Sequence, residues 1–300
     1  MPMNSPFNRR LLALHRARAL AQRTEGADFL LRLVAQDIED RLAVTTHKFA
    51  LALDLGGHTG QVRNALERSD RVETVLRADL FVPDQGSGKP DLVVDDEILP
   101  FADGSLDLVV SALSLHWVND LPGALIQIRR ALKPDGLFLG ALADGDTLWE
   151  LRDALLSAEA ELTGGASPRV SPFADTREMG GLLQRAGFAL PVADQDRLTV
   201  RYDSAFHLMR DLRAMGATGI LAERGAPASR ALFMKTVEIY AERHADPDGR
   251  IRATFQILSV SGWAPHESQQ QPLKPGSAKM SFAEALGTNE IATGDKPSRT

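Results

Sequence analysis

Residues 51–60, with the sequence LALDLGGHTG, combine the side chains that a binding loop for a nucleotide-like ligand needs. An apolar run ends at Asp54, and glycines follow at Gly56, Gly57 and Gly60. Glycines between a strand and a helix let a ligand approach the backbone closely, and the free amides at the helix start favour negative charge. The stretch therefore predicts a nucleotide pocket, with a purely structural tight turn as the alternative.

The end of the next expected strand carries a second acidic residue, Asp79. In folds that bind nucleotides after such a loop, an acidic side chain at this point accepts hydrogen bonds from the ribose hydroxyls. Asp79 is therefore a predicted ribose ligand, and Leu80 beside it is a further predicted contact. The strand, the turn, the helix and the acidic residue together favour the ligand-binding interpretation.

His58 stands at the centre of the loop, where loops of this kind usually have another glycine. A dinucleotide fingerprint of the form GxGxxG beginning at Gly56 fails at His58 and at Gln61, which weakens the case for NAD or FAD. A positive φ at His58 would cost on the order of 1 kcal/mol. The imidazole then either crowds or selects the ligand, or it is a turn residue that faces solvent.

The elements that would position these residues alternate between strands and helices. Short apolar runs of the kind found in buried parallel strands are separated by helical patterns, which predicts βαβ units and a doubly wound sheet. The helix expected at 121–136 is closed by Pro134 and Gly136. The expected strands of this first half are 49–56, 72–79, 92–94, 106–117 and 137–144.

The second half of the chain is richer in helical patterns. We expect strands at 197–202 and 253–265, and helices at 147–162, 176–188, 204–216 and 231–244. The predicted organisation is an N-terminal helical cap (1–48), a ligand-binding domain (49–268) with a helical insertion at about 145–250, and a C-terminal segment with a disordered tail (269–300).

The composition narrows the possible functions. With 44% hydrophobic and 25% charged residues the chain resembles ordinary soluble globular proteins, and its net charge of −6 argues against general affinity for nucleic acid. The absence of cysteine excludes disulfides, thiolate metal sites and cysteine nucleophiles. No apolar run approaches the roughly 20 residues of a transmembrane helix. The Arg-rich N-terminus fits a surface helix better than a transit peptide.

Several segments resemble the motifs of class I S-adenosylmethionine-dependent methyltransferases. The pattern D-x-G-x-x-x-G from Asp54 resembles their first motif, residues 93–120 resemble their third and fourth, and residues 130–141 resemble the helix and turn before strand five. The resemblance implies a Rossmann-like α/β fold with a seven-stranded, mostly parallel sheet. It also implies that Asp95 receives the adenine amino group, that the amide of Asp96 lies beside the ring, and that Ser111, Ala112 and Leu113 line the methionine end.

A narrower resemblance covers about residues 7–285. The segments 111–125, 145–152, 167–175 and 262–282 together resemble the family of mitochondrial complex I assembly factor 5 and its bacterial relatives. This resemblance implies S-adenosylmethionine as cofactor, and its eukaryotic member hydroxylates an arginine of a complex I subunit. The loop DLGGHTG departs from the usual DLGCGRG of the family. The location implied is the cytoplasm for a bacterial chain and the mitochondrial matrix for a eukaryotic one.

The sequence offers few candidates for catalytic residues. Methyl transfer from a sulfonium needs positioning and exclusion of water, and a base where the acceptor is a poor nucleophile. His116 is the candidate base, with a packed histidine as the alternative. The seven histidines form no compact ligand cluster, so we expect no metal site.

We therefore expect an enzyme that modifies a protein substrate, with a complex I subunit as the favoured substrate, by methylation or by arginine hydroxylation. The alternatives are a non-catalytic assembly chaperone with the same fold and a small-molecule methyltransferase of the biotin-synthesis type.

Overall fold

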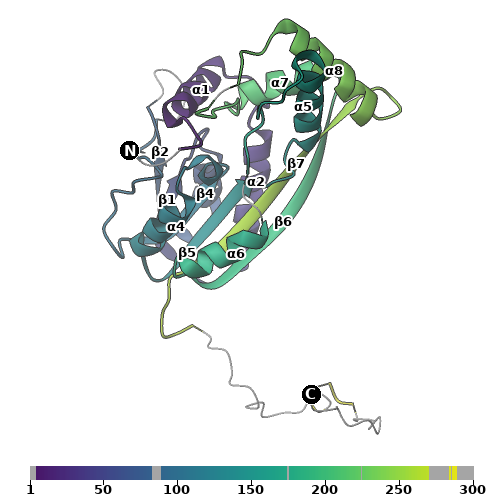
Figure 1. The fold of residues 1–300 in the computed structure, drawn as a ribbon. Coiled ribbons are helices and arrows are strands. Elements are labelled where there is room, and N and C mark those ends of the chain that lie inside the picture. The colour runs from purple at the N-terminus through teal and green to yellow at the C-terminus, as the bar shows by residue number, and fades with distance from the viewer. Residues whose placement is uncertain are drawn as a thin grey trace, which may run out of the picture. The chain divides into compact units, whose positions relative to one another are not determined.

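A computed structural model describes residues 5–82, 89–173, 176–223, 225–269, 284 and 286–288 of the chain. Its centre is a seven-stranded sheet in the order β3-β2-β1-β4-β5-β7-β6 (Figure 1). Strands β3, β2, β1, β4 and β5 are parallel, and β7 runs antiparallel to both of its neighbours. The strands are β1 Phe49–Leu55, β2 Val72–Asp79, β3 Leu92–Val93, β4 Leu106–Ala112, β5 Leu132–Ala143, β6 Ala189–Tyr202 and β7 Ile251–Trp263. The predicted α/β fold with a mostly parallel sheet is confirmed.

Helices cover both faces of the parallel part of the sheet. Helices α2 (Phe29–Ala43) and α3 (Gln61–Arg68) pack on one face, and α4 (Leu121–Ala131) and α6 (Thr176–Arg185) pack on the other. Strands β1 and β4 lie between these layers, which explains why their sequences are nearly continuous apolar runs. Both strands end at the same edge of the sheet, so the residues that follow them come close together.

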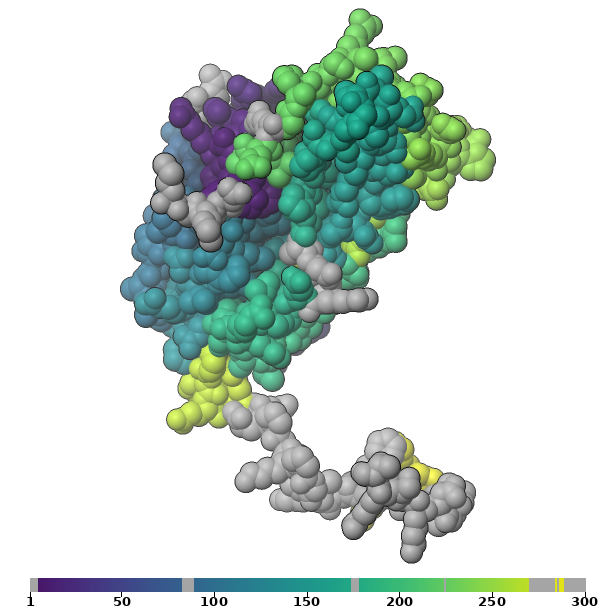
Figure 2. Space-filling model, viewed as in Figure 1, coloured from purple at the N-terminus to yellow at the C-terminus, as the bar shows by residue number. Residues whose placement is uncertain are grey.

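The remaining helices build a third hydrophobic cluster at one end of the sheet. Helices α5 (Trp149–Thr163), α7 (Ala205–Ala214) and α8 (Arg230–His244) pack with the beginning of β7, around the buried Tyr240. Helix α1 (Arg9–Gln22) lies between the first strands and these helices in the space-filling view, where it is purple (Figure 2). The N-terminal helices therefore contribute directly to the edge of the sheet where the glycine loop lies.

Several predicted element boundaries were wrong. The helix expected at 121–136 ends at Ala131, because the residue before Pro134 is disfavoured in a helix and Leu132 instead pairs with Leu106 at the start of β5. The fourth strand ends at Ala112 rather than at residue 117, and a short 3-10 turn, Leu115–Trp117, follows. Strand β6 begins at residue 189 instead of 197, since its whole length pairs with β7.

The chain divides into a compact unit, Met1–His266, and a second unit, Glu267–Thr300. Helices α5 to α8 fall within the predicted insertion at about 145–250, although that stretch also contains β6. Most of the predicted C-terminal segment lies outside the described residues. No helix in the described part of the chain combines the length and the apolar character that crossing a bilayer requires.

Candidate functional site

The glycine loop after β1 has a backbone that side chains would disturb. Gly56 and Gly60 have φ values of 78° and 82°, in the left-handed region that favours glycine. A Cβ atom on Gly56 would lie 2.3 Å from Ser114 Oγ, and one on Gly57 would lie 2.6 Å from Asp54 Oδ2. The three glycines are buried, and the side chains of Ser114, Asp54 and Arg77 pack against them, so the loop is held tightly against the ends of β1 and β4 and against β2.

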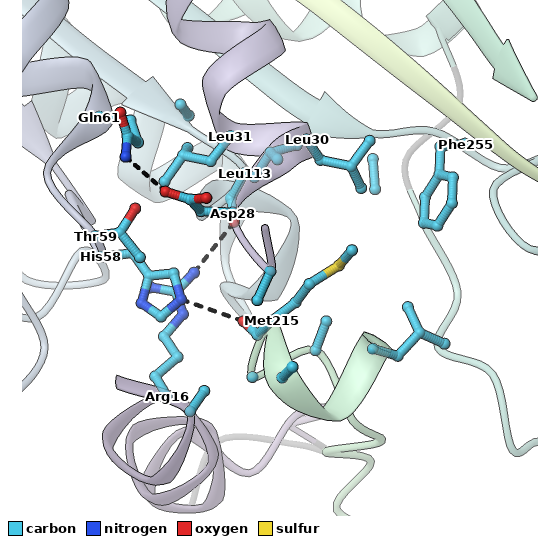
Figure 3. A pocket seen from close by; sticks show the side chains of 18 of the residues that line it. Arg16, Asp28, Leu30, Leu31, His58, Thr59, Gln61, Leu113, Met215 and Phe255 are labelled. Atoms are coloured by element: carbon cyan, nitrogen blue, oxygen red, sulfur yellow. Dashed lines mark hydrogen bonds between the residues drawn. The ribbon is translucent and has the colours of Figure 1, made fainter. Parts of the chain in front are cut away.

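His58 adopts the positive φ considered from the sequence, at 39°. Its backbone N–H donates to Asp79 Oδ2 at 2.8 Å, and its Nε2 lies 3.2 Å from the carbonyl oxygen of Met215 (Figure 3). A carbonyl can only accept, so Nε2 carries the proton and Nδ1 is an acceptor. Burial, followed by the positive charge of Arg16, lowers the pKa of His58 to about 3. The residue is thus a neutral link between the loop and the segment after α7, not a turn residue facing solvent.

The predicted acidic ligands gather at the ends of the neighbouring strands. Asp79 ends β2 and accepts a hydrogen bond from the N–H of Leu80 at 2.7 Å. Asp95 and Asp96 follow β3, and Asp96 Oδ2 accepts from Ser114 Oγ at 3.0 Å. The sheet therefore brings together the residues that the sequence assigned to the ribose and to the adenine. Their binding roles stay predictions.

Helix α1 covers these carboxylates, which the sequence did not predict. Arg9 pairs with Asp95 at 3.0 Å and with Asp96, and Arg16 lies 3.9 Å from Asp79. The crevice between α1 and the ends of β2 and β3 has no room for a water molecule. The signal available was the spacing of Arg9 and Arg16, two turns apart on the side of the helix that carries Leu12.

A cavity of about 450 Å³ opens beside the glycine loop. Apolar walls come from α2, β4, α7 and β7, and polar groups come from α1, the α1–α2 connection and the loop (Figure 3). Leu113 lines this cavity, as does Ala112, whereas Ser111 is fully buried in the sheet and lies outside the cavity lining. The predicted methionine side therefore borders a space large enough for a cofactor end and an acceptor group.

His116, the predicted base, also lines the cavity. Its Nδ1 accepts a long hydrogen bond of 3.4 Å from the N–H of Ala143, and its ring packs against Trp117 and Phe173. Burial and then the charge of Arg16 lower the pKa of His116 to about 3. A base works best when its pKa lies near the working pH, so this environment makes His116 a weak one. Its catalytic role stays a prediction.

Asp54 is fully buried at the end of β1. Burial raises the pKa of its carboxyl to about 7, with the negative charge of Asp79 adding to the effect and Arg77 opposing it. The carboxyl group of Asp54 packs against Gly57 and leaves no space for a side chain at that position. Asp54 therefore belongs to the support of the loop and does not line either cavity.

The residues present fit an S-adenosylmethionine-like group. His58 Nδ1 and Thr59 Oγ1 are shielded from solvent without a hydrogen-bond partner among the described residues, and both side chains line the cavity. Buried polar atoms normally have partners, so a polar ligand would satisfy them. Asp79, Asp95 and Asp96 would hold the nucleoside end only after α1 moves away, because Arg9 and Arg16 pair with these carboxylates and the crevice beside them has no room for a water molecule. His58, Thr59 and Leu113 border the open cavity, where the other end would lie. Among the described residues, no group of three or more His, Asp or Glu side chains could hold a metal ion.

Replacing Asp79 by alanine should weaken binding of S-adenosylhomocysteine by about 1–3 kcal/mol, or roughly 5- to 150-fold. The variant loses the ribose acceptor and leaves the N–H groups of His58 and Leu80 without their partner. Calorimetric titration measures the effect, and Asp103→Ala, at a side chain 68% exposed, is the control. Unchanged affinity in Asp79→Ala would refute the ribose assignment.

Comparisons with known proteins identify the fold that carries these residues. A family model described as a methyltransferase domain matches residues 53–140, which contain the loop and the ends of β2 to β4. A solved structure from Bacillus halodurans C-125, described as a candidate methyltransferase, superposes with a TM-score of 0.52 at 16% identity, covering 77% of this chain and 98% of that one. The class I methyltransferase fold is confirmed, and the domain match implies S-adenosylmethionine as the cofactor.

Curated relatives are similar over most of the chain. The protein named arginine-hydroxylase NDUFAF5, mitochondrial, is 41% identical in Mus musculus over 277 residues, which is 90% of this chain and 80% of that protein. The human protein of the same name is 41% identical over 91% of this chain and 80% of its own length. Malonyl-[acyl-carrier protein] O-methyltransferase of Laribacter hongkongensis is 35% identical over 86% of this chain and 90% of its own length.

Proposed function

This chain belongs to the arginine-hydroxylase NDUFAF5 family, within the class I S-adenosylmethionine-dependent methyltransferase superfamily, and from that membership we propose that it modifies a protein substrate during assembly of respiratory complex I. The modified group in this proposal is an arginine side chain of a complex I subunit. The reaction is methylation, which adds a methyl group to the arginine, or hydroxylation, which adds an oxygen atom. We place the protein in the cytoplasm if its source is bacterial and in the mitochondrial matrix if it is eukaryotic.

Two carboxylates in the lining of the cavity, which also contains Arg16 and Arg23, could pair with a cationic acceptor. Glu25 and Asp28 are the two carboxylate residues among its described lining, and both lie in the connection between α1 and α2. Asp28 Oδ2 accepts from Gln61 Nε2 at 2.5 Å, which holds this connection against the first turn of α3. A guanidinium group pairs well with carboxylates, and its aliphatic stem suits apolar walls such as Leu30 and Phe255. This pairing of acidic rim and apolar wall is the observation that carries the proposal.

The chain's own residues would contribute positioning and exclusion of water. When bound, the cofactor would supply an electrophilic methyl group. In methylation the acceptor nitrogen gains this methyl group and loses a proton, and the cofactor becomes S-adenosylhomocysteine. The glycine loop and Asp79 orient the cofactor, and the apolar walls keep water from the reacting atoms. His116 is neutral at pH 7, since its pKa is about 3, so it can accept a proton only weakly.

The proposal is tested by incubating the purified protein with methyl-labelled S-adenosylmethionine and separately purified complex I subunits, in the presence of dioxygen and an added reductant, because hydroxylation inserts one oxygen atom of O2, consumes two electrons and releases the other oxygen atom as water. Peptide mass spectrometry should find one arginine that gains either a methyl group carrying the label or an oxygen atom without it. Modification at no arginine of any subunit, with cofactor binding intact, would contradict the proposal. Cofactor-independent capture of a subunit without modification would instead favour the assembly chaperone.

The similarity to malonyl-[acyl-carrier protein] O-methyltransferases supports a second candidate, a carboxyl methyltransferase. Methylation of a malonyl-loaded carrier protein tests it in the same assay. We rank this candidate second because the chain is 35% identical to that methyltransferase and 41% identical to the arginine-hydroxylase.

A further inference from the structure

Arg16 is the one buried cationic side chain in the described lining of the cavity. It extends from α1 toward the glycine loop (Figure 3), and 5% of the residue is exposed. Its Nη2 donates to the carbonyl oxygen of Leu113 at 3.1 Å, and its Nη1 donates to Ser114 Oγ at 3.4 Å. Both partners are neutral, so these contacts satisfy hydrogen bonds but do not balance the charge.

Arg16 has one long ion pair among the described residues. Its partner is Asp79, whose Oδ1 is 3.9 Å from Arg16 Nη1, and both oxygens of Asp79 already accept backbone N–H groups. The two imidazoles nearby, His58 and His116, are neutral at pH 7 because burial lowers each pKa to about 3. A buried guanidinium whose ion pair is long and not hydrogen-bonded is incompletely compensated, and an anionic ligand would lower the remaining cost.

Arg16 lies where the methionine end of the cofactor is predicted to bind. Arg16 lines both the cavity and the narrow crevice toward Asp79 and Asp96, so it stands between the nucleoside side and the open space. Its two hydrogen-bond partners follow β4, where the methionine end is predicted. S-Adenosylmethionine carries one anionic group, the carboxylate of its methionine portion.

We propose that Arg16 of the N-terminal helix binds the methionine carboxylate of the cofactor. The planar guanidinium can donate two parallel hydrogen bonds to a carboxylate, which fixes the direction of the methionine portion as well as its charge. The contact also ties α1 to the bound cofactor. This inference rests on cofactor binding and is independent of the acceptor and of the reaction in the proposed function.

The test compares Arg16→Met with the wild type against two ligands. S-Adenosylhomocysteine has the carboxylate, whereas methylthioadenosine has the same nucleoside and thioether but lacks the amino acid. Affinity for S-adenosylhomocysteine should fall by about 10- to 100-fold in Arg16→Met, as expected for a charge-assisted hydrogen bond. Affinity for methylthioadenosine should stay the same. Arg18→Met, at an exposed position of the same helix, should change neither affinity.

Other results would overturn the assignment. Equal weakening for both ligands would make Arg16 a structural residue, and tighter binding of both would mean that its side chain fills ligand space. Failure of the wild type to bind S-adenosylhomocysteine would also refute it. Thermal unfolding of each variant separates loss of the fold from loss of the contact. A ligand-dependent difference without any modified arginine would leave this inference intact and reject the proposed function.

Discussion

Gly56→Ala should lower the free energy of unfolding by about 2–5 kcal/mol, the largest stability loss that we expect from a single methyl group in the site. Two causes add. The φ of 78° at Gly56 is strained for alanine, and the new Cβ would lie 2.3 Å from Ser114 Oγ and 2.4 Å from Ser114 Cβ. Urea unfolding, followed by circular dichroism at one pH, measures the loss. Affinity for S-adenosylhomocysteine should also fall, because Ser114 holds both Arg16 and Asp96.

Gly104→Ala separates the two causes. Gly104 has a similar φ of 66°, but a Cβ added there would have no atom within 4 Å, so alanine meets strain without overlap. We expect a loss of about 1 kcal/mol and no change in ligand affinity. Equal losses at the two positions would show that the contact with Ser114 relaxes freely, and the loop would then not depend on close packing against the end of β4.

Local patterns were sufficient to predict the parallel strands and the residues at their ends. Apolar runs that stop at Asp54 and Asp79 mark strand ends whatever the rest of the chain does, and parallel strands bring those ends to one edge. The error at Leu132 has two causes: the local signal of Pro134, which disfavours a helix at the residue before it, was given too little weight, and the pairing of Leu132 with Leu106 starts β5 early. Such pairing is a tertiary contact and leaves no local signal.

The part of the site that closes over the strand ends could not be predicted. Arg9 and Arg16 belong to an Arg-rich helix whose sequence shows no partner, and their contacts lie in segments far along the chain. His58 was recognised as unusual, but its bond to the carbonyl oxygen of Met215 requires the placement of α7. A buried charge is visible only when the fold is known, so Arg16 became a candidate ligand through the structure.

Asp54→Asn should change the pH dependence of the free energy of unfolding. Between pH of about 4 and about 7, the difference between the variant and the wild type should grow by up to about 4 kcal/mol. Burial raises the pKa of Asp54 from 3.8 in the unfolded chain to about 7 in the folded one. Between these values the folded state binds more protons than the unfolded state, so this carboxyl makes stability fall as pH rises. Asparagine cannot ionise, and the variant should therefore gain stability relative to the wild type across this range.

The comparison of the two proteins isolates Asp54 from the other buried groups. His58 and His116, each with a pKa lowered to about 3, act in the opposite direction, since they remove stability as pH falls below about 6.5. They are present in both proteins, so their effects cancel in the difference. Urea unfolding at several pH values should give a difference that grows up to pH 7 and is constant above it. A difference independent of pH would mean that Asp54 is ionised throughout, and that Arg77 rather than burial controls its charge.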